Sequence, residues 1–136
     1  MDAQDRVLLV DDGLELVMFL KLILKFQFSF HVFPTIDAGS AINMLHEGIF
    51  EMVITDYSMP GMNGMNLLER VGEIQPQAVK VLISGLQPDE RIEQALKNGI
   101  VDLFLPKPLK MNSMLTLLRP LLDKSALSKT NPKTAA

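Results

Sequence analysis

The chain alternates short, purely apolar runs with longer stretches in which apolar positions recur every three or four residues. The first apolar run, RVLLVD at 6–11, ends abruptly in acidic residues, which is typical of a strand buried on both faces of a parallel sheet. From 13 to 25 the apolar residues recur mostly at helical spacing and leave Glu15, Lys21 and Lys25 for the solvent side. We therefore predict a strand at 6–11 and a helix at 13–25.

The same alternation repeats as far as residue 122. We predict further strands at 28–33, 52–55, 79–84 and 101–105, and further helices at 38–46, 65–74, 90–98 and 112–122. Asp37 can cap the second helix, Pro34 indicates a strand end or a sheet edge, and Gly99 suits the left-handed residue that ends the fourth helix. Strands that alternate with such helices form right-handed crossovers and a parallel sheet covered on both faces. We predict an α/β, flavodoxin-like (βα)5 three-layer sandwich with sheet order 2-1-3-4-5.

Size and composition predict one folded domain. A chain of 136 residues has the commonest domain size. Hydrophobic residues make up 48% and charged residues 21% of it, which excludes the weakly hydrophobic, highly charged class of disordered proteins. We predict one domain at 1–124 and a polar segment at 125–136 that is a disordered tail or the start of a linker.

Charge and cysteine content narrow the compartment and the partners. The absence of cysteine excludes disulfides, thiolate nucleophiles and cysteine-ligated metal centres, and it favours a reducing, cytoplasmic location. A net charge of -3 gives no broad positive field, so we expect no direct nucleic acid binding by this segment. The most apolar stretch, 14–30, is interrupted by Lys21 and Lys25, so we expect no membrane span.

Reactive side chains follow the predicted strands. Asp11 and Asp12 end the first strand, Asp56 follows the third, Ser84 ends the fourth and Lys107 follows the fifth. Because ligands of open parallel sheets bind at the carboxyl ends of the strands, we expect these groups to converge. Three clustered carboxylates repel one another unless a cation joins them. Oxygen-only ligation favours Mg²⁺, with Mn²⁺ as the second candidate.

A metal at this edge would prepare one carboxylate for phosphoryl chemistry. Aspartate is an established nucleophile in aspartyl-phosphate formation, and we assign that role to Asp56. The metal and Lys107 would offset the charge on the transferring phosphoryl oxygens. The hydroxyl of Ser84 is suited to hydrogen-bond one of those oxygens afterwards.

Four motifs in one ordered series resemble the receiver domains of two-component response regulators. They are VLLVDD at 7–12, VITDYSMPGMNG at 53–64, VLISG at 81–85 and FLPKP at 104–108, and the resemblance covers about 6–122. It implies phosphorylation of Asp56, and Mg²⁺ held by Asp11, Asp12, Asp56 and the backbone carbonyl of Ser58. By the same resemblance, Lys107 and Ser84 read the phosphoryl group.

The resemblance also implies a switch rather than an enzyme with a separate substrate. Ser84 would move toward the phosphoryl group and Phe104 would rotate into the vacated space, which reshapes the face of the fourth helix, fifth strand and fifth helix. The implied partners are a histidine kinase or a histidine phosphotransfer protein, and an output domain or effector protein. A homodimer through the same face is a further expectation by analogy.

Departures from the family pattern are few. Gly13 stands where the family often has an acidic residue, and Ser84 replaces the commoner threonine. By resemblance, Leu86 lies beside the path of the hydrolytic water. We therefore predict a longer lifetime of the phosphoryl group than glutamate at this position would give. Two alternatives are less favoured. A pseudo-receiver that binds partners without phosphotransfer is disfavoured because all five site residues are present, and a flavodoxin-like FMN protein is disfavoured because only Asp11, Asp12 and Gly13 follow the first strand.

Overall fold

The computed structural model of the protein describes residues 6–130, and the side chains as far as Leu122. Its strands are β1 (Arg6–Val10), β2 (His31–Thr35), β3 (Met52–Asp56), β4 (Val79–Ser84) and β5 (Leu103–Pro106). Its helices are α1 (Leu14–Phe28), α2 (Ala38–Glu47), α3 (Gly64–Ile74), α4 (Glu90–Lys97) and α5 (Met111–Thr130). The strands pair in parallel in the order β2-β1-β3-β4-β5, which confirms the predicted sheet.

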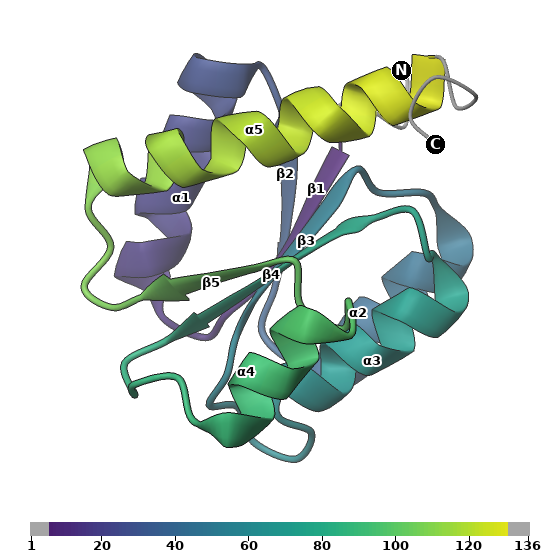
Figure 1. Ribbon diagram of the computed structural model, residues 1–136, viewed down its shortest axis with the longest axis vertical. Helices are drawn as coiled ribbons and strands as arrows, with labels where there is room; N and C mark the ends of the chain where they lie inside the picture. The colour runs from purple at the N-terminus through teal and green to yellow at the C-terminus, as the bar shows by residue number, and fades with distance from the viewer. Residues whose placement is uncertain (1–5, 131–136) are drawn as a thin grey trace.

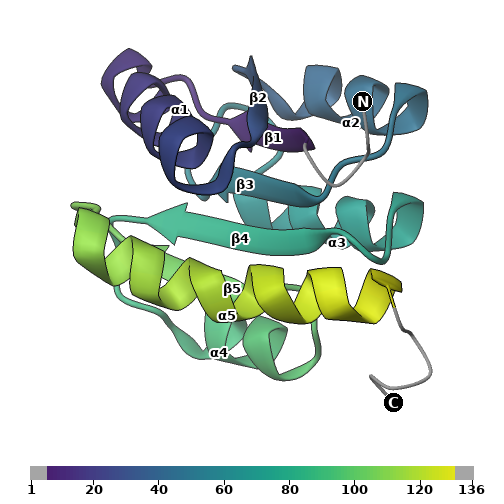
Figure 2. The ribbon, with the colours of Figure 1, turned by 90° about the horizontal axis from the view of Figure 1, so that it is seen from above.

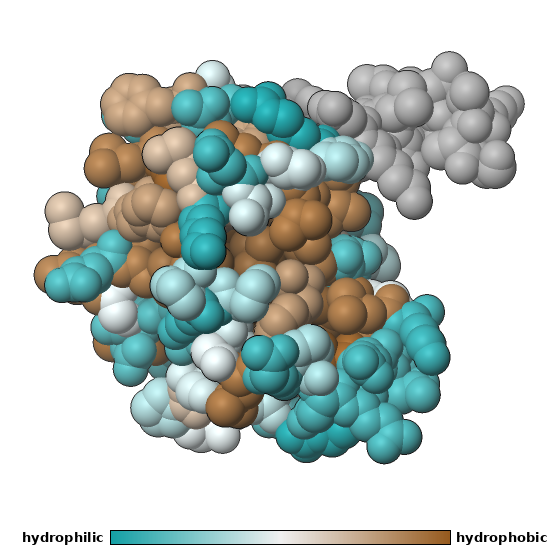
Figure 3. Space-filling view, turned by 60° about the vertical axis from the view of Figure 1, so that its left-hand side comes forward, coloured by the Kyte–Doolittle hydropathy of each residue, from teal (hydrophilic) through white to brown (hydrophobic). Residues whose placement is uncertain are grey.

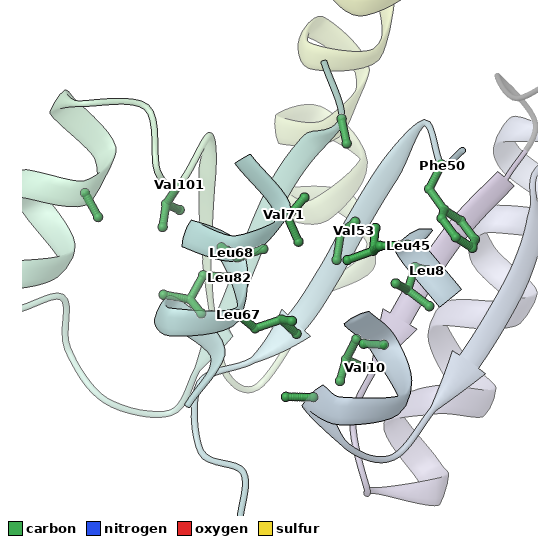
Figure 4. Packing of buried hydrophobic residues seen from close by; sticks show 14 of the residues in the cluster. Leu8, Val10, Leu45, Phe50, Val53, Leu67, Leu68, Val71, Leu82 and Val101 are labelled. Atoms are coloured by element: carbon green, nitrogen blue, oxygen red, sulfur yellow. The ribbon is translucent and has the colours of Figure 1, made fainter. Parts of the chain in front are cut away.

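Helices cover both faces of the sheet (Figures 1 and 2), with α1 and α5 on one face and α2, α3 and α4 on the other. Successive strand residues point to opposite faces. Leu8 and Val10 therefore enter the core under α2, α3 and α4, which Figure 4 shows, whereas Val7 and Leu9 enter the core under α1 and α5. A strand with two buried faces has no solvent-facing positions, which explains its apolar sequence.

The second strand lies later in the chain than its sequence pattern predicts. The predicted strand at 28–33 is wrong in its first residues, because α1 continues to Phe28 and β2 begins at His31. The helix ends at Ser29, whose φ of 59° is left-handed, and the N–H of Phe30 closes the last turn by donating to the carbonyl oxygen of Leu24 at 3.1 Å. Pro34 lies in the edge strand β2, as predicted.

Two other boundaries differ from the prediction. β5 begins at Leu103, because the N–H of Val101 donates to the carbonyl oxygen of Ala95 at 3.1 Å and closes the end of α4. α5 runs to Thr130, so 125–130, predicted as tail or linker, are helical, while 131–136 lie outside the described residues. Segment 125–130 contains Ala, Leu and Lys and lacks Gly and Pro, which is compatible with a helix despite its polar character.

The predicted ends of α1 at 25 and of β2 at 33 are also wrong, because α1 ends at Phe28 and β2 at Thr35. The remaining element boundaries agree with the prediction to within one residue. The carboxylate of Asp37 caps α2 by accepting the N–H of Ser40 at 2.7 Å. Gly99 has a φ of 83° just after α4, as predicted for a left-handed C-terminal residue. Within the described part of the chain, no helix combines the length and the apolar character needed to cross a membrane.

Candidate functional site

Three carboxylates meet at the carboxyl ends of β1 and β3. One ligand oxygen from each of Asp11, Asp12 and Asp56 lies within 4.8 Å of the others. Asp11 and Asp56 are buried, whereas Asp12 is exposed. The parallel register pairs Val10 with Thr55, so the residues that follow in each strand are neighbours. The predicted convergence of the three aspartates is confirmed, at the edge that the arrowheads of β4 and β5 mark in Figure 1.

Lys107 joins this cluster from the loop after β5. Its ammonium nitrogen lies 3.2 Å from Oδ1 of Asp56. The backbone N–H of Lys107 donates to the carbonyl oxygen of Ser84 at 2.9 Å, and the bond from Lys107 to Pro108 is cis. The end of β4 therefore fixes the backbone from which the lysine reaches Asp56.

Asp11 carries the electrostatic signature of a cation site. Its Oδ1 accepts the N–H of Gly13 at 2.6 Å, while its Oδ2 is buried without a hydrogen-bond partner among the described residues. Burial raises the pKa of the Asp11 carboxyl, and the charges of Asp56 and Asp12 raise it further, against the opposing effects of the Gly13 N–H and the Lys107 ammonium. A buried, unpartnered carboxylate oxygen beside two other carboxylates fits a hard divalent cation.

We expect Asp11→Asn to stabilise the metal-free protein at neutral pH. Folding raises the pKa of Asp11 above its ordinary value of 3.8. Ionisation of Asp11 therefore lowers the free energy of unfolding as the pH rises from 3.8 through the raised pKa. Asparagine does not ionise. The free energy of unfolding of Asp11→Asn should therefore exceed that of the wild type by an amount that is small near pH 3.8 and grows with pH, as measured by urea unfolding in the presence of a chelator. Mg²⁺ should narrow this gap, because Asp11→Asn should weaken Mg²⁺ binding at least about tenfold. A difference independent of pH would contradict the electrostatic account.

The other predicted site residues are Ser84, Phe104 and Ser58. Ser84 is buried, and its hydroxyl oxygen accepts the N–H of Leu86 at 3.0 Å. Phe104 is partly buried and packs against the core under α2, α3 and α4. Alternation along β4 and β5 places the side chains of Ser84 and Phe104 on the same face of the sheet. Ser58 lies in the exposed part of the loop after β3, and metal ligation by its carbonyl stays a prediction.

Gly64 is a site residue that the sequence analysis missed. Its N–H donates to the carbonyl oxygen of Tyr57 at 2.8 Å, and α3 begins there directly against the end of β3. A Cβ at this position would overlap the Asp56 carbonyl group, lie 2.9 Å from the Asp56 carbonyl carbon, and lie 3.0 Å from Cδ1 of Leu82. The signal in the sequence was a glycine opening a helix, which can indicate a close backbone approach.

Tyr57 links the site to α4. Its phenolic oxygen accepts a hydrogen bond from Nη2 of Arg91 at 2.7 Å. Tyr57 is the one tyrosine of a chain without tryptophan. The tyrosine fluorescence of the protein therefore reports on the surroundings of the residue next to Asp56. The contact between Tyr57 and Arg91 could not be predicted from the sequence alone.

Comparisons with known proteins point to one family. A model of the response regulator receiver domain matches residues 7–119. The two-component response regulator ARR10 of Arabidopsis thaliana is 31% identical over 91% of this chain and 22% of its own length. The transcriptional regulatory protein TctD of Salmonella typhimurium is 32% identical over 89% of this chain and 53% of its own length. The chain thus spans about a fifth to a half of these relatives.

Solved structures give the same fold. The crystal structure of adenylate cyclase from Rhodopirellula baltica superposes with a TM-score of 0.84 at 27% identity, covering 96% of both chains. A CheY-like receiver domain from Methanospirillum hungatei has a TM-score of 0.80 at 24% identity over 90% of this chain and 96% of its own. The response regulator TrrA of Thermotoga maritima, solved with Mg(2+)-BeF, has a TM-score of 0.73 at 20% identity over 86% of this chain and 98% of its own.

Proposed function

Because the chain belongs to the response regulator receiver domain family, we propose that it is a phospho-accepting switch of a two-component system that works in the cytoplasm. In this proposal Asp56 takes a phosphoryl group from a histidine kinase or a histidine phosphotransfer protein. The observation that carries it is the meeting of three aspartates within 4.8 Å with the Lys107 ammonium 3.2 Å from Asp56. Phosphoryl transfer to an aspartate uses these groups: a carboxylate nucleophile, ligands for a metal ion and a cationic side chain.

Asp56 is the nucleophile of the proposed reaction. A carboxylate oxygen of Asp56 forms a bond to phosphorus as the bond between phosphorus and the donor's leaving group breaks. Lys107, already 3.2 Å from Asp56, can offset the charge on a phosphoryl oxygen without a large movement. Mg²⁺ held by Asp11, Asp12, Asp56 and the Ser58 carbonyl, with Mn²⁺ as the alternative, would supply further positive charge. The bound Mg(2+)-BeF of the Thermotoga receiver supports this assignment.

Ser84 and Phe104 form the proposed switch. The Ser84 hydroxyl accepts the N–H of Leu86, so its own proton is free to donate to a phosphoryl oxygen. A shift of Ser84 toward Asp56 would change the space available to Phe104, whose side chain lies on the same face of the sheet. The populations of two arrangements of the α4/β5/α5 face would then depend on the phosphoryl group.

The partners follow from this switch. The α4/β5/α5 face would bind an output domain or an effector protein, or a second receiver in a homodimer. The phosphodonor protein would approach α1, where Leu14, Met18, Leu22 and Phe26 form an exposed apolar stripe at intervals of four residues. We propose that the chain catalyses only its own phosphorylation and dephosphorylation, and that it does not bind nucleic acid directly.

Intact mass spectrometry tests the proposed function. The protein should gain about 80 Da, the mass of one phosphoryl group, after incubation with acetyl phosphate and Mg²⁺. A chelator should prevent the gain, because repulsion within the aspartate cluster is then uncompensated. Tyr57 fluorescence should report Mg²⁺ binding in parallel. Folded protein that binds Mg²⁺ and gains no mass would instead support the pseudo-receiver.

Leu86→Glu should shorten the lifetime of the phosphoryl group. The Leu86 side chain is 65% exposed beside Ser84, and a carboxylate there can orient an attacking water, whereas leucine cannot. We expect phosphate loss after removal of acetyl phosphate to accelerate about tenfold or more, short of the roughly hundredfold or larger effect of a fully positioned general base, because the residue at 86 is exposed. Leu86→Gln is the control variant, because glutamine adds a polar side chain without the charge of glutamate. Unchanged or slower loss in Leu86→Glu would contradict this account.

A further inference from the structure

Helix α1 is apolar on the face that points away from the sheet as well as on the face that packs against it. Its buried side chains are Leu20, Ile23 and Leu24. The outer face carries the apolar stripe, whose four side chains are 72%, 56%, 55% and 73% exposed, namely Leu14, Met18, Leu22 and Phe26. Figure 3 turns the side of the molecule on which α1 lies forward and shows apolar side chains over much of it. The stripe contributes little to the core, and a contiguous apolar surface of this kind is typical of a binding surface.

Charged side chains flank the stripe and differ in sign between its two ends. Glu15 lies in the first turn of α1 and Lys25 in its last turn, with Lys21 one turn before Lys25. All three are exposed, and none forms an ion pair with another described residue. Glu15 and Lys25 are about 15 Å apart along the helix, so they cannot pair within one chain. An antiparallel helix of the same sequence would bring a lysine to Glu15 and a glutamate to Lys25.

We propose that the stripe binds the stripe of a second copy of this chain, in a symmetric dimer of two antiparallel α1 helices. In a dimer with a twofold axis the same surface meets itself, so each contact between two different residues occurs twice. An axis near the middle of α1 pairs Glu15 of each copy with Lys25 of the other. Residues four apart form one ridge of a helix, and two such ridges pack with the helix axes inclined at about 50°.

The size of the stripe sets the strength of this dimer. Pairing two stripes removes roughly 1,000 Å² of surface from water, which is near the lower limit for a specific interface and implies a weak, reversible dimer. The exposed charge pairs add little affinity, but they favour the antiparallel orientation over the parallel one, in which like charges would meet. This surface differs from the α4/β5/α5 face, on which the proposed switch acts.

The dimer also limits access to α1. A phosphodonor protein and a second copy cannot occupy the stripe at the same time, so a rise in receiver concentration protects Asp56 from phosphodonor proteins. This consequence rests on the proposed function, whereas the dimer itself does not.

Sedimentation equilibrium tests the dimer between about 10 µM and about 1 mM, the range expected of a weak interface. Met18→Glu places a charge in both halves of the stripe contact, so a tenfold effect per copy should weaken the dimer about a hundredfold. Leu117→Glu is the matched control, because Leu117 is 42% exposed on α5 and lies outside the stripe. It should dimerise as the wild type does.

Two outcomes of this experiment would overturn the proposal. A wild type that stays monomeric would leave the stripe to the phosphodonor protein. A dimer that is lost in Leu117→Glu and kept in Met18→Glu would place the interface on the α4/β5/α5 face.

Exchanging the two charges tests the antiparallel orientation. Glu15→Lys and Lys25→Glu should each weaken the dimer about tenfold, because each variant sets two pairs of like charges opposite one another. The double variant should dimerise within about twofold of the wild type, since every pair is again of opposite sign. Losses that add up in the double variant would overturn the antiparallel α1 dimer. Dimerisation without phosphorylation by acetyl phosphate would support the dimer and overturn the proposed function.

Discussion

Asp56→Asn should abolish the gain of a phosphoryl group from acetyl phosphate and Mg²⁺. Asparagine has the shape of aspartate but lacks the anionic oxygen that attacks phosphorus. Its amide oxygen can still accept a hydrogen bond from Lys107, which lies 3.2 Å from Oδ1 of Asp56 in the wild type. The fold should therefore survive, and losing one charge beside Asp11 relieves repulsion in the metal-free protein. We expect the phosphorylation rate to fall by at least about a thousandfold.

Two variants make this result specific. Asp37→Asn is the matched control, because asparagine also caps helices well and Asp37 lies outside the acidic cluster. It should gain a phosphoryl group as the wild type does. Asp12→Asn keeps the nucleophile and loses one exposed ligand, so its slower reaction should recover when Mg²⁺ is raised. A mass gain that persists in Asp56→Asn would assign the nucleophile to another residue.

Gly64→Ala should destabilise the protein by about 2–3 kcal/mol, the upper part of the range for overpacking a close contact. Alanine in a helix is ordinarily more stable than glycine by about 0.5–1 kcal/mol, so the sign of the effect is itself diagnostic. At Gly64 the added methyl group overlaps the Asp56 carbonyl group, and either α3 or the end of β3 must move. We expect slower phosphorylation as well, because the displaced backbone is that of the nucleophile.

The same helix provides the control for this prediction. Gly72 lies inside α3, and a Cβ at that position meets nothing within 4 Å. Gly72→Ala should therefore stabilise the protein by about 0.5–1 kcal/mol. Urea unfolding of both variants should give changes of opposite sign. Similar changes in the two variants would mean that Gly64 does not constrain Asp56.

The sequence determined the sheet order and most of the site, for one physical reason. Parallel strands align their carboxyl ends, so chemistry at the end of several strands meets at one edge wherever the strands pair in order. The apolar runs located each strand end to within a residue or two. The sequence alone therefore predicted that four side chains meet at this edge, namely Asp11, Asp12, Asp56 and Lys107. The doubly buried strands gave the clearest pattern, since they have no solvent-facing positions.

Segments governed by competing local patterns were less predictable. Phenylalanine at 26, 28 and 30 alternates like a strand, yet the chain stays helical to Phe28, where the Phe28 and Phe30 rings stack with centroids 5.8 Å apart. At the other end of the chain, a polar composition suggested a tail, but polarity alone does not forbid a helix, and α5 continues to Thr130. Both segments are helical in the structure. The spacing of apolar residues in the first segment and the polar composition of the second were also compatible with other structures.

Contacts between distant segments were settled by tertiary structure alone. Sequence places Gly64 eight positions after Asp56, but only the packing of α3 against β3 brings its Cα so close to the Asp56 carbonyl that no side chain fits. The unpartnered Oδ2 of Asp11 and the bond from Arg91 to Tyr57 likewise depend on burial and on the placement of helices. Sequence thus determined which groups reach the edge of the sheet. Tertiary packing decided their distances and exposure, because these depend on atoms far apart in the chain.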